Sequence, residues 1–115
     1  MAKPNASTNV QLTILPYCYV NIPKPVDVTV TIPGQIPENK TEVVIGCNYN
    51  YNIKVSWKLP TNWPKEVTTH DDLSGINLSS GLHKGNIWLS GITTLEDLAA
   101  TYKGTVTVTV SVANN

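Results

Sequence analysis

Residues 104–112 read Gly-Thr-Val-Thr-Val-Thr-Val-Ser-Val, and this stretch decides the fold class. Valines alternate with hydroxyl-bearing residues, so an extended chain places the valines on one face and the hydroxyls on the other. β-Branched side chains also favour a pleated strand over a helix. The stretch is therefore predicted to be a β-strand with one face in a hydrophobic core and the other in water.

The same alternation recurs along the chain between prolines and glycines. Further strands are predicted at residues 10–14, 17–22, 26–32, 41–47, 51–59, 66–69 and 86–90. The short connection at residues 48–50 predicts that its two flanking strands form an antiparallel hairpin. Residues 94–100 are the one helix-like stretch, with Thr94 as its cap. Seven or eight short strands with one short helical turn predict an all-β sandwich or small barrel.

Length and composition limit the classes of function. A chain of 115 residues is long enough for one domain with its own core. We expect a flexible N-terminal segment at residues 1–8 and a single β-sandwich domain at residues 9–115. The net charge of zero argues against nucleic acid as a partner, because nucleic acid requires a basic surface. No apolar run reaches the length of a membrane span, so membrane insertion is not expected.

The composition is typical of a β-rich extracellular protein. The polar strand faces carry hydroxyls instead of Lys and Glu. No signal-peptide pattern is present at residues 1–3, Met-Ala-Lys, and we expect a mature chain from which a leader has been removed. A cytoplasmic protein that starts at its own methionine is the alternative.

The two cysteines, Cys18 and Cys47, lie on apparent inward faces of two predicted strands. Two free buried thiols are one interpretation. We prefer a disulfide, because both side chains face the expected core. Closing this loop would stabilise the fold by roughly 3–4 kcal/mol in the chain-entropy model, and it implies an oxidising compartment.

No group of residues indicates catalysis. No serine lies in a Gly-x-Ser-x-Gly elbow, and Glu96-Asp97 fits a helix start better than an acid–base pair. The stretch His70-Asp71-Asp72 lacks the further nitrogen or thiolate ligands that a metal site requires. We therefore predict that the protein is not an enzyme and has no metal and no cofactor.

Aromatic residues offer a different function. Trp57 shares a face with Ile53 and Val55, so we expect it in the core. Trp63 lies in a polar loop, and Tyr49 flanks a turn. These two side chains are the candidates for a ligand-stacking platform that would bind carbohydrate.

The order of these segments resembles a known family. Val10-x-Leu12-x-Ile14 precedes the first cysteine, and Val44-Ile45-Gly46-Cys47 closes a strand. The stretch Tyr51-Asn52-Ile53-Lys54-Val55-Ser56 follows, and residues 100–110 read Ala-Thr-Tyr-Lys-Gly-Thr-Val-Thr-Val-Thr-Val. This arrangement resembles the spore coat protein U family and the related pilin subunits of archaic chaperone–usher fimbriae. The resemblance implies a secreted immunoglobulin-like antiparallel β-sandwich with one disulfide.

The resemblance also implies a function. In that family, the segment before the first cysteine is a donor strand that fills a groove in a neighbouring subunit. The matching residues here are Val10, Leu12 and Ile14, and valines of residues 26–32 and 104–112 would line the groove. An added strand removes both a free edge and an unfilled core.

We therefore expect a secreted, non-catalytic structural or adhesive subunit at the cell surface. Its partners would be other copies of itself or related surface subunits. The alternatives are a monomeric carbohydrate- or ligand-binding module and an accessory domain of a larger surface protein.

Overall fold

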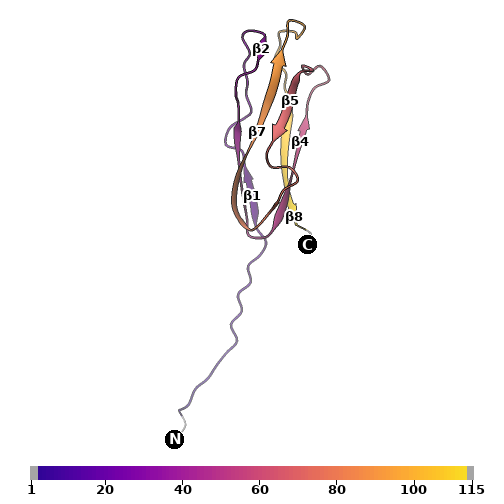
Figure 1. Cartoon of the computed structure of the whole chain (residues 1–115). Helices are drawn as coiled ribbons and strands as arrows, with labels where there is room; N and C mark the ends of the chain where they lie inside the picture. Colours follow the sequence, from indigo (N-terminus) through magenta and orange to yellow (C-terminus); the bar gives the residue numbers. More distant parts are fainter. Residues whose placement is uncertain (1–2, 114–115) are drawn as a thin grey trace.

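The computed structural model describes residues 3–113, and these form an all-β structure of two antiparallel sheets with an extended N-terminal tail (Figure 1). Residues 1–2 of the expected N-terminal segment and residues 114–115 of the expected domain lie outside the described residues. The strands are β1 (Cys18–Asn21), β2 (Gly34–Gln35), β3 (Thr41–Cys47), β4 (Tyr51–Lys58), β5 (Val67–Asp71), β6 (Asn77–Leu78), β7 (Gly81–Thr93) and β8 (Thr105–Val112).

The larger sheet is built on β7. Strand β3 pairs with the first half of β7, and β1 pairs with the other edge of β3. Strands β5 and β2 pair with the second half of β7. The smaller sheet has the order β6-β4-β8, and β8 pairs with β4 along its whole length.

The core lies between the sheets, near the end of the molecule where β3 ends and β4 begins. Val43, Ile45 and Ile87 of the larger sheet are fully buried, as is Tyr51 of the smaller one. Leu73, from the connection between β5 and β6, completes the cluster. The predicted alternation is therefore confirmed for β3 and for the first part of β4.

The disulfide between Cys18 and Cys47 is present. It joins directly opposite residues of the neighbouring strands β1 and β3, with their Cα atoms 4.1 Å apart. It therefore fastens a four-residue edge strand to the larger sheet.

The predicted hairpin between residues 41–47 and 51–59 is wrong. Strand β3 belongs to the larger sheet and β4 to the smaller, so residues 48–50 form an arch between the sheets. Cys47 and Tyr51, on either side of the arch, are both buried in the core. The Asn50 carbonyl of this arch accepts a hydrogen bond from the N–H of Ala113, the residue that follows β8.

The predicted helical turn at residues 94–100 does not become a helix. The capping chemistry is present, because the Thr94 N–H donates to Asp97 Oδ2 (2.8 Å) and the Glu96 N–H donates to Thr94 Oγ1 (3.2 Å). The Leu95 and Leu98 side chains, however, are 91% and 79% exposed. Without an apolar face packed on the sandwich, the segment stops after one turn.

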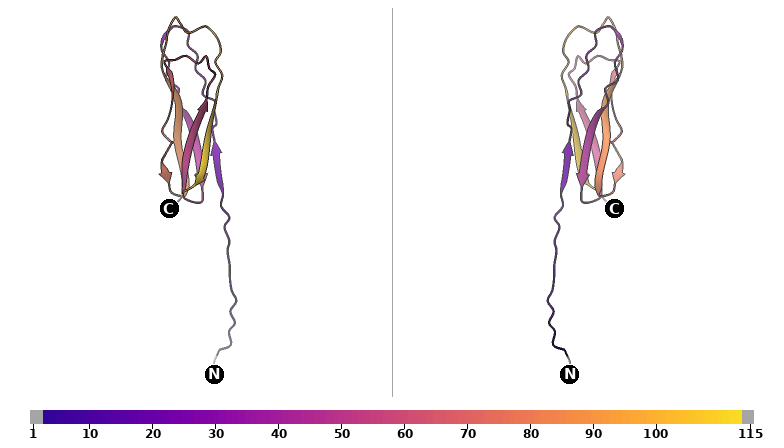
Figure 2. Two further views of the ribbon diagram at one scale, coloured as in Figure 1. Left: turned by 90° about the vertical axis from the view of Figure 1, so that its right-hand side faces the viewer. Right: turned by 90° about the vertical axis from the view of Figure 1, so that its left-hand side faces the viewer.

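Two predicted strands find no partner within residues 3–113. Residues 10–14 lie in the tail, which runs away from the sandwich in both views of Figure 2. Residues 26–32 run along the open edge of the sandwich without joining a sheet. The other predicted strands are confirmed, with residues 66–69 matching β5 and residues 86–90 lying within the longer β7.

Candidate functional site

A groove of about 700 Å³ opens between the two sheets at the end of the sandwich opposite the tail. We call this cavity the valine groove. Its lining includes Val26, Val28, Val30, Trp57, Leu59, Trp63, Leu98, Tyr102 and Val106. The groove therefore lies between the unpaired segment 25–31 and the start of β8.

Both side walls of the groove carry unpaired backbone. Within residues 3–113, β8 pairs with β4 alone, and its first residues, Thr105 and Val106, line the groove. Within residues 3–113, the segment 25–31 makes no backbone hydrogen bond to another part of the chain. Such edges are templates for an additional strand.

The valines around the groove are incompletely buried. Val106, Val108 and Val110 of β8 point toward the core but remain half-buried, and Val30 is 39% exposed. The sequence predicts that the valine face of residues 104–112 lies in a core, and the structure places it there only in part. An apolar strand in the groove would cover the side chains that remain open.

Trp63 lies in the connection between β4 and β5, and its side chain lines the groove. Its indole N–H donates to the Val67 carbonyl at 2.9 Å. Its ring packs edge-on against Tyr102, with the ring centres 6.4 Å apart. Trp57 is half-buried and contacts the core cluster, as the sequence predicts.

The structure does not bring Trp63 and Tyr49 together. Tyr49 precedes the first residue of β4 and packs against the core cluster, whereas Trp63 follows the last residue of β4. An eight-residue strand is roughly 25 Å long. The two side chains therefore do not form one stacking platform.

The N-terminal tail presents its apolar side chains to solvent. Val10, Leu12 and Ile14 are 92%, 83% and 73% exposed. The tail is drawn as an extended chain that leaves the sandwich beside the start of β1 (Figure 2). The alternating apolar side chains of the tail are thus available to a partner.

Asn48 fixes the root of this tail. The Tyr17 N–H donates to Asn48 Oδ1 at 2.8 Å, and Asn48 Nδ2 donates to the Leu15 carbonyl at 2.9 Å. The Asn48 N–H donates in turn to the Tyr17 carbonyl at 3.0 Å. These bonds set the direction in which the tail leaves the sandwich, a role that no pattern in the sequence indicates.

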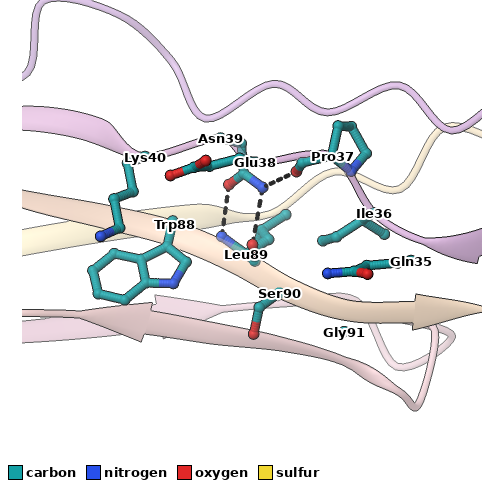
Figure 3. A pocket seen from close by; sticks show the side chains of 10 residues that line it. All are labelled: Gln35, Ile36, Pro37, Glu38, Asn39, Lys40, Trp88, Leu89, Ser90 and Gly91. Atoms are coloured by element: carbon teal, nitrogen blue, oxygen red, sulfur yellow. Dashed lines mark hydrogen bonds between the residues drawn. The ribbon is translucent and has the colours of Figure 1, made fainter.

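A second, smaller hollow of about 270 Å³ lies beside Trp88 (Figure 3). Lys40 Nζ lies 5.1 Å from the centre of the Trp88 ring, and the His70 ring stacks on Trp88 from the neighbouring strand β5 at 5.7 Å. Asn39 stabilises the rim of this hollow, because its side chain forms hydrogen bonds with both the N–H and the carbonyl of Leu89. Lys40 and His70 therefore both lie against the Trp88 ring.

The stretch His70-Asp71-Asp72 is used within the fold. Oδ1 of Asp71 accepts hydrogen bonds from the N–H groups of Leu73 and Ser74. Oδ1 of Asp72 accepts from the Asn86 N–H at 2.7 Å. Within residues 3–113 no cluster of three or more His, Cys, Asp or Glu side chains is assembled for a metal ion. No helix in the same part of the chain could span a membrane.

Within residues 3–113, the groove and the tail are therefore the two apolar features that lack a partner.

Comparisons of the chain with protein-family models, with curated proteins and with solved structures found no match in any of the three.

Proposed function

We propose that the protein is a secreted, non-catalytic structural subunit of a cell surface that associates by strand addition. The tail of one copy, with Val10, Leu12 and Ile14, would fill the valine groove of the next copy. The observation that carries this proposal is one chain with two unpaired backbone walls around an apolar groove and an exposed apolar strand of its own.

The spacing of the side chains supports this pairing. Val10, Leu12 and Ile14 repeat every two residues, which is roughly 6.6 Å along an extended chain. Val26, Val28 and Val30 repeat at the same interval on one wall, and Val106 of β8 lies on the other. A strand between the walls could therefore present one apolar side chain to each valine of the segment 25–31.

The energetics require both the apolar contacts and the backbone bonds. Burying three side chains of this size contributes roughly 5–9 kcal/mol. Association itself costs about 4–15 kcal/mol, so the apolar term alone does not secure a tight complex. Each backbone hydrogen bond adds about 0.5–1.5 kcal/mol, and a strand between two unpaired walls can form them on both sides.

Insertion between copies fits the geometry better than insertion within one copy. Ile14 is four residues before Cys18, so it reaches at most about 14 Å from the start of β1. The groove begins near Pro25, beyond the whole of β1. The tail also leaves the sandwich at the opposite end from the groove. A second copy is therefore the better acceptor.

The proposal includes an immunoglobulin-like arrangement of the two sheets and kinship with the spore coat protein U and archaic pilin subunits. The segment order described above supports it, as does the disulfide next to the tail. The disulfide joins two strands of one sheet, whereas in antibody domains it joins the two sheets. The likeness to antibodies would thus lie in the sandwich and not in the position of the disulfide.

The test is the replacement of Leu12 by aspartate in the full chain, with Thr13→Asp as the matched control. Thr13 faces away from Val10, Leu12 and Ile14, so its replacement leaves the apolar face intact. Light scattering across a range of concentrations should show association of the wild type and of T13D. Leu12→Asp should weaken association by roughly a hundredfold or more, because it removes a buried leucine and inserts a charge. A wild type that stays monomeric, or an L12D variant that associates as well as T13D, would overturn the proposal.

A further inference from the structure

Beyond residues 10–14, large apolar side chains are exposed at both ends of the sandwich, among other places. Ile32, Leu95 and Leu98 are 77%, 91% and 79% exposed at the groove end, and we call them the apical patch. Leu15 and Tyr17 are 74% and 64% exposed at the root of the tail, and we call them the basal patch. Each end thus carries apolar surface that its own chain leaves uncovered.

The apical patch is held in place by backbone structure. Gly34 lies opposite Thr93 in the last pair between β2 and β7, and Ile32 and Leu95 each lie two residues beyond this pair. The turn at residues 94–97 is closed by the Thr94–Asp97 hydrogen bonds. Leu95 therefore projects from a closed turn.

The basal patch is equally fixed. Asn48 bonds the Leu15 carbonyl and the Tyr17 N–H, and it follows directly on Cys47 of the disulfide. The Tyr17 ring also packs near Tyr19, with ring centres 6.3 Å apart. The residues that connect the donor strand to its own sandwich are thus part of the sandwich surface and not a free linker.

The groove admits a donor strand in one direction. Strand β1 lies against β8 at the basal end, which closes that end of the space between the sheet edges. The lining at the other end of the groove includes Pro33, Ala99 and Leu98 of the apical patch, so we take this end as the opening. A donor strand whose Ile14 sits at this opening would place its own Leu15 and Tyr17 directly outside, over the apical patch.

We propose that the apical patch docks on the basal patch of a second copy, as an additional contact between the same two subunits that exchange a strand. This inference rests on the proposed function, because strand addition brings the two patches together. The donor strand would then run antiparallel to β8, and successive copies would stack base to apex with little freedom to bend.

The first test is Leu95→Asp in the full chain, with Ser56→Asp on the exposed outer face of β4 as the matched control. Leu95 does not line the groove, so strand insertion remains available to this variant. Light scattering should show that L95D raises the dissociation constant by roughly tenfold or more, the equivalent of losing one buried leucine, while S56D does not.

The second test is a cross-link. A chain with Leu95→Cys and Tyr17→Cys should give a ladder of covalent oligomers on a non-reducing gel, and the pair L95C with S56C should not. If L95D associates as strongly as S56D and no ladder forms, the end-to-end contact is wrong while strand addition stands, provided that L12D still prevents association. If L12D has no effect, the proposed function fails, and the end-to-end contact loses its basis with it.

Discussion

Asn48 is the residue on which the geometry of the tail depends. Asn48→Ala removes both side-chain hydrogen bonds to the tail root but leaves the sandwich core untouched. We predict faster hydrogen exchange at the Tyr17 N–H, with a small loss of stability of about 1 kcal/mol because these bonds are exposed.

The matched variant is Asn48→Asp. It keeps an acceptor for the Tyr17 N–H and loses only the donor to the Leu15 carbonyl. Tyr17 exchange should therefore stay slow in N48D. Equal exchange rates in the wild type and in N48A would contradict the role assigned to Asn48.

Tyr51 is fully buried, and its hydroxyl has no hydrogen-bond partner within residues 3–113. Replacing Tyr51 by phenylalanine should therefore cost nothing, or stabilise the fold by about 1 kcal/mol, because it removes an unpaired polar group. Urea unfolding at neutral pH measures this effect. A loss of more than about 1 kcal/mol would show that the hydroxyl has a stabilising partner.

Burial also makes Tyr51 a source of alkaline sensitivity, because desolvation raises the pKa of its hydroxyl above the ordinary value of 10.0. The folded state then holds this proton more tightly than the unfolded state. The stabilisation is complete below about pH 10 and is lost as the pH rises through the higher folded pKa. Wild type should lose stability above pH 10 more steeply than Tyr51→Phe, and urea unfolding at a series of pH values measures the difference.

At the scale of elements, β1 depends most on a covalent bond. It has four residues, lies at a sheet edge and is joined to β3 by the disulfide. Replacing Cys18 and Cys47 together by serine should lower the free energy of unfolding by roughly 3–4 kcal/mol, since the bond closes a loop with a sequence separation of 29. Chemical denaturation measures the loss, and reduced wild-type protein should match the double variant. A difference below about 1 kcal/mol would show that backbone pairing alone holds β1.

The elements that the sequence predicts well are those whose backbone finds a partner nearby. Alternation identifies β3, β4 and β8 because side chains that share a face share a core. Alternation says nothing about whether the backbone has a partner, so residues 10–14 and 26–32 look like strands yet stand unpaired. The short connection at 48–50 is equally compatible with a hairpin and with an arch, and only the placement of β3 and β4 in different sheets decides.

The candidate site also has parts that the sequence predicts and parts that it does not. The apolar face of Val10, Leu12 and Ile14 is readable from spacing alone, and so are the valines of one groove wall. Trp57 and Leu59 alternate along one strand, so their shared face is readable from spacing, whereas the contact of Trp63 with Tyr102 forms only when the chain folds. The separation of Tyr49 from Trp63 follows from the length of β4, which the alternation at residues 51–59 already predicts. Asn48 has no sequence signature, because its partners are 31 and 33 residues away.

At the scale of the whole molecule, the donor strand carries no charge that could pair with Asp27 and Asp97 of the groove lining. Residues 4–16 contain no charged side chain, and the protein has a net charge of zero. The association constant should therefore change little with sodium chloride, and sulfate should raise it by strengthening apolar burial. Light scattering in a series of each salt measures both effects. A steep fall with sodium chloride would indicate that ion pairs dominate the interface.

The placement of the tail and the groove at opposite ends gives the proposed assembly the behaviour of a step-growth polymer. Each bond that forms leaves one unused donor at one terminus and one unused acceptor at the other, so no length is preferred and the two termini differ. A peptide of residues 4–16 would act as a chain stopper, since it occupies acceptors and supplies none. Average length would then fall in inverse proportion to the fraction of acceptors that the peptide occupies. A cell that builds such a polymer could set its length by the supply of one capping molecule, without altering the subunit.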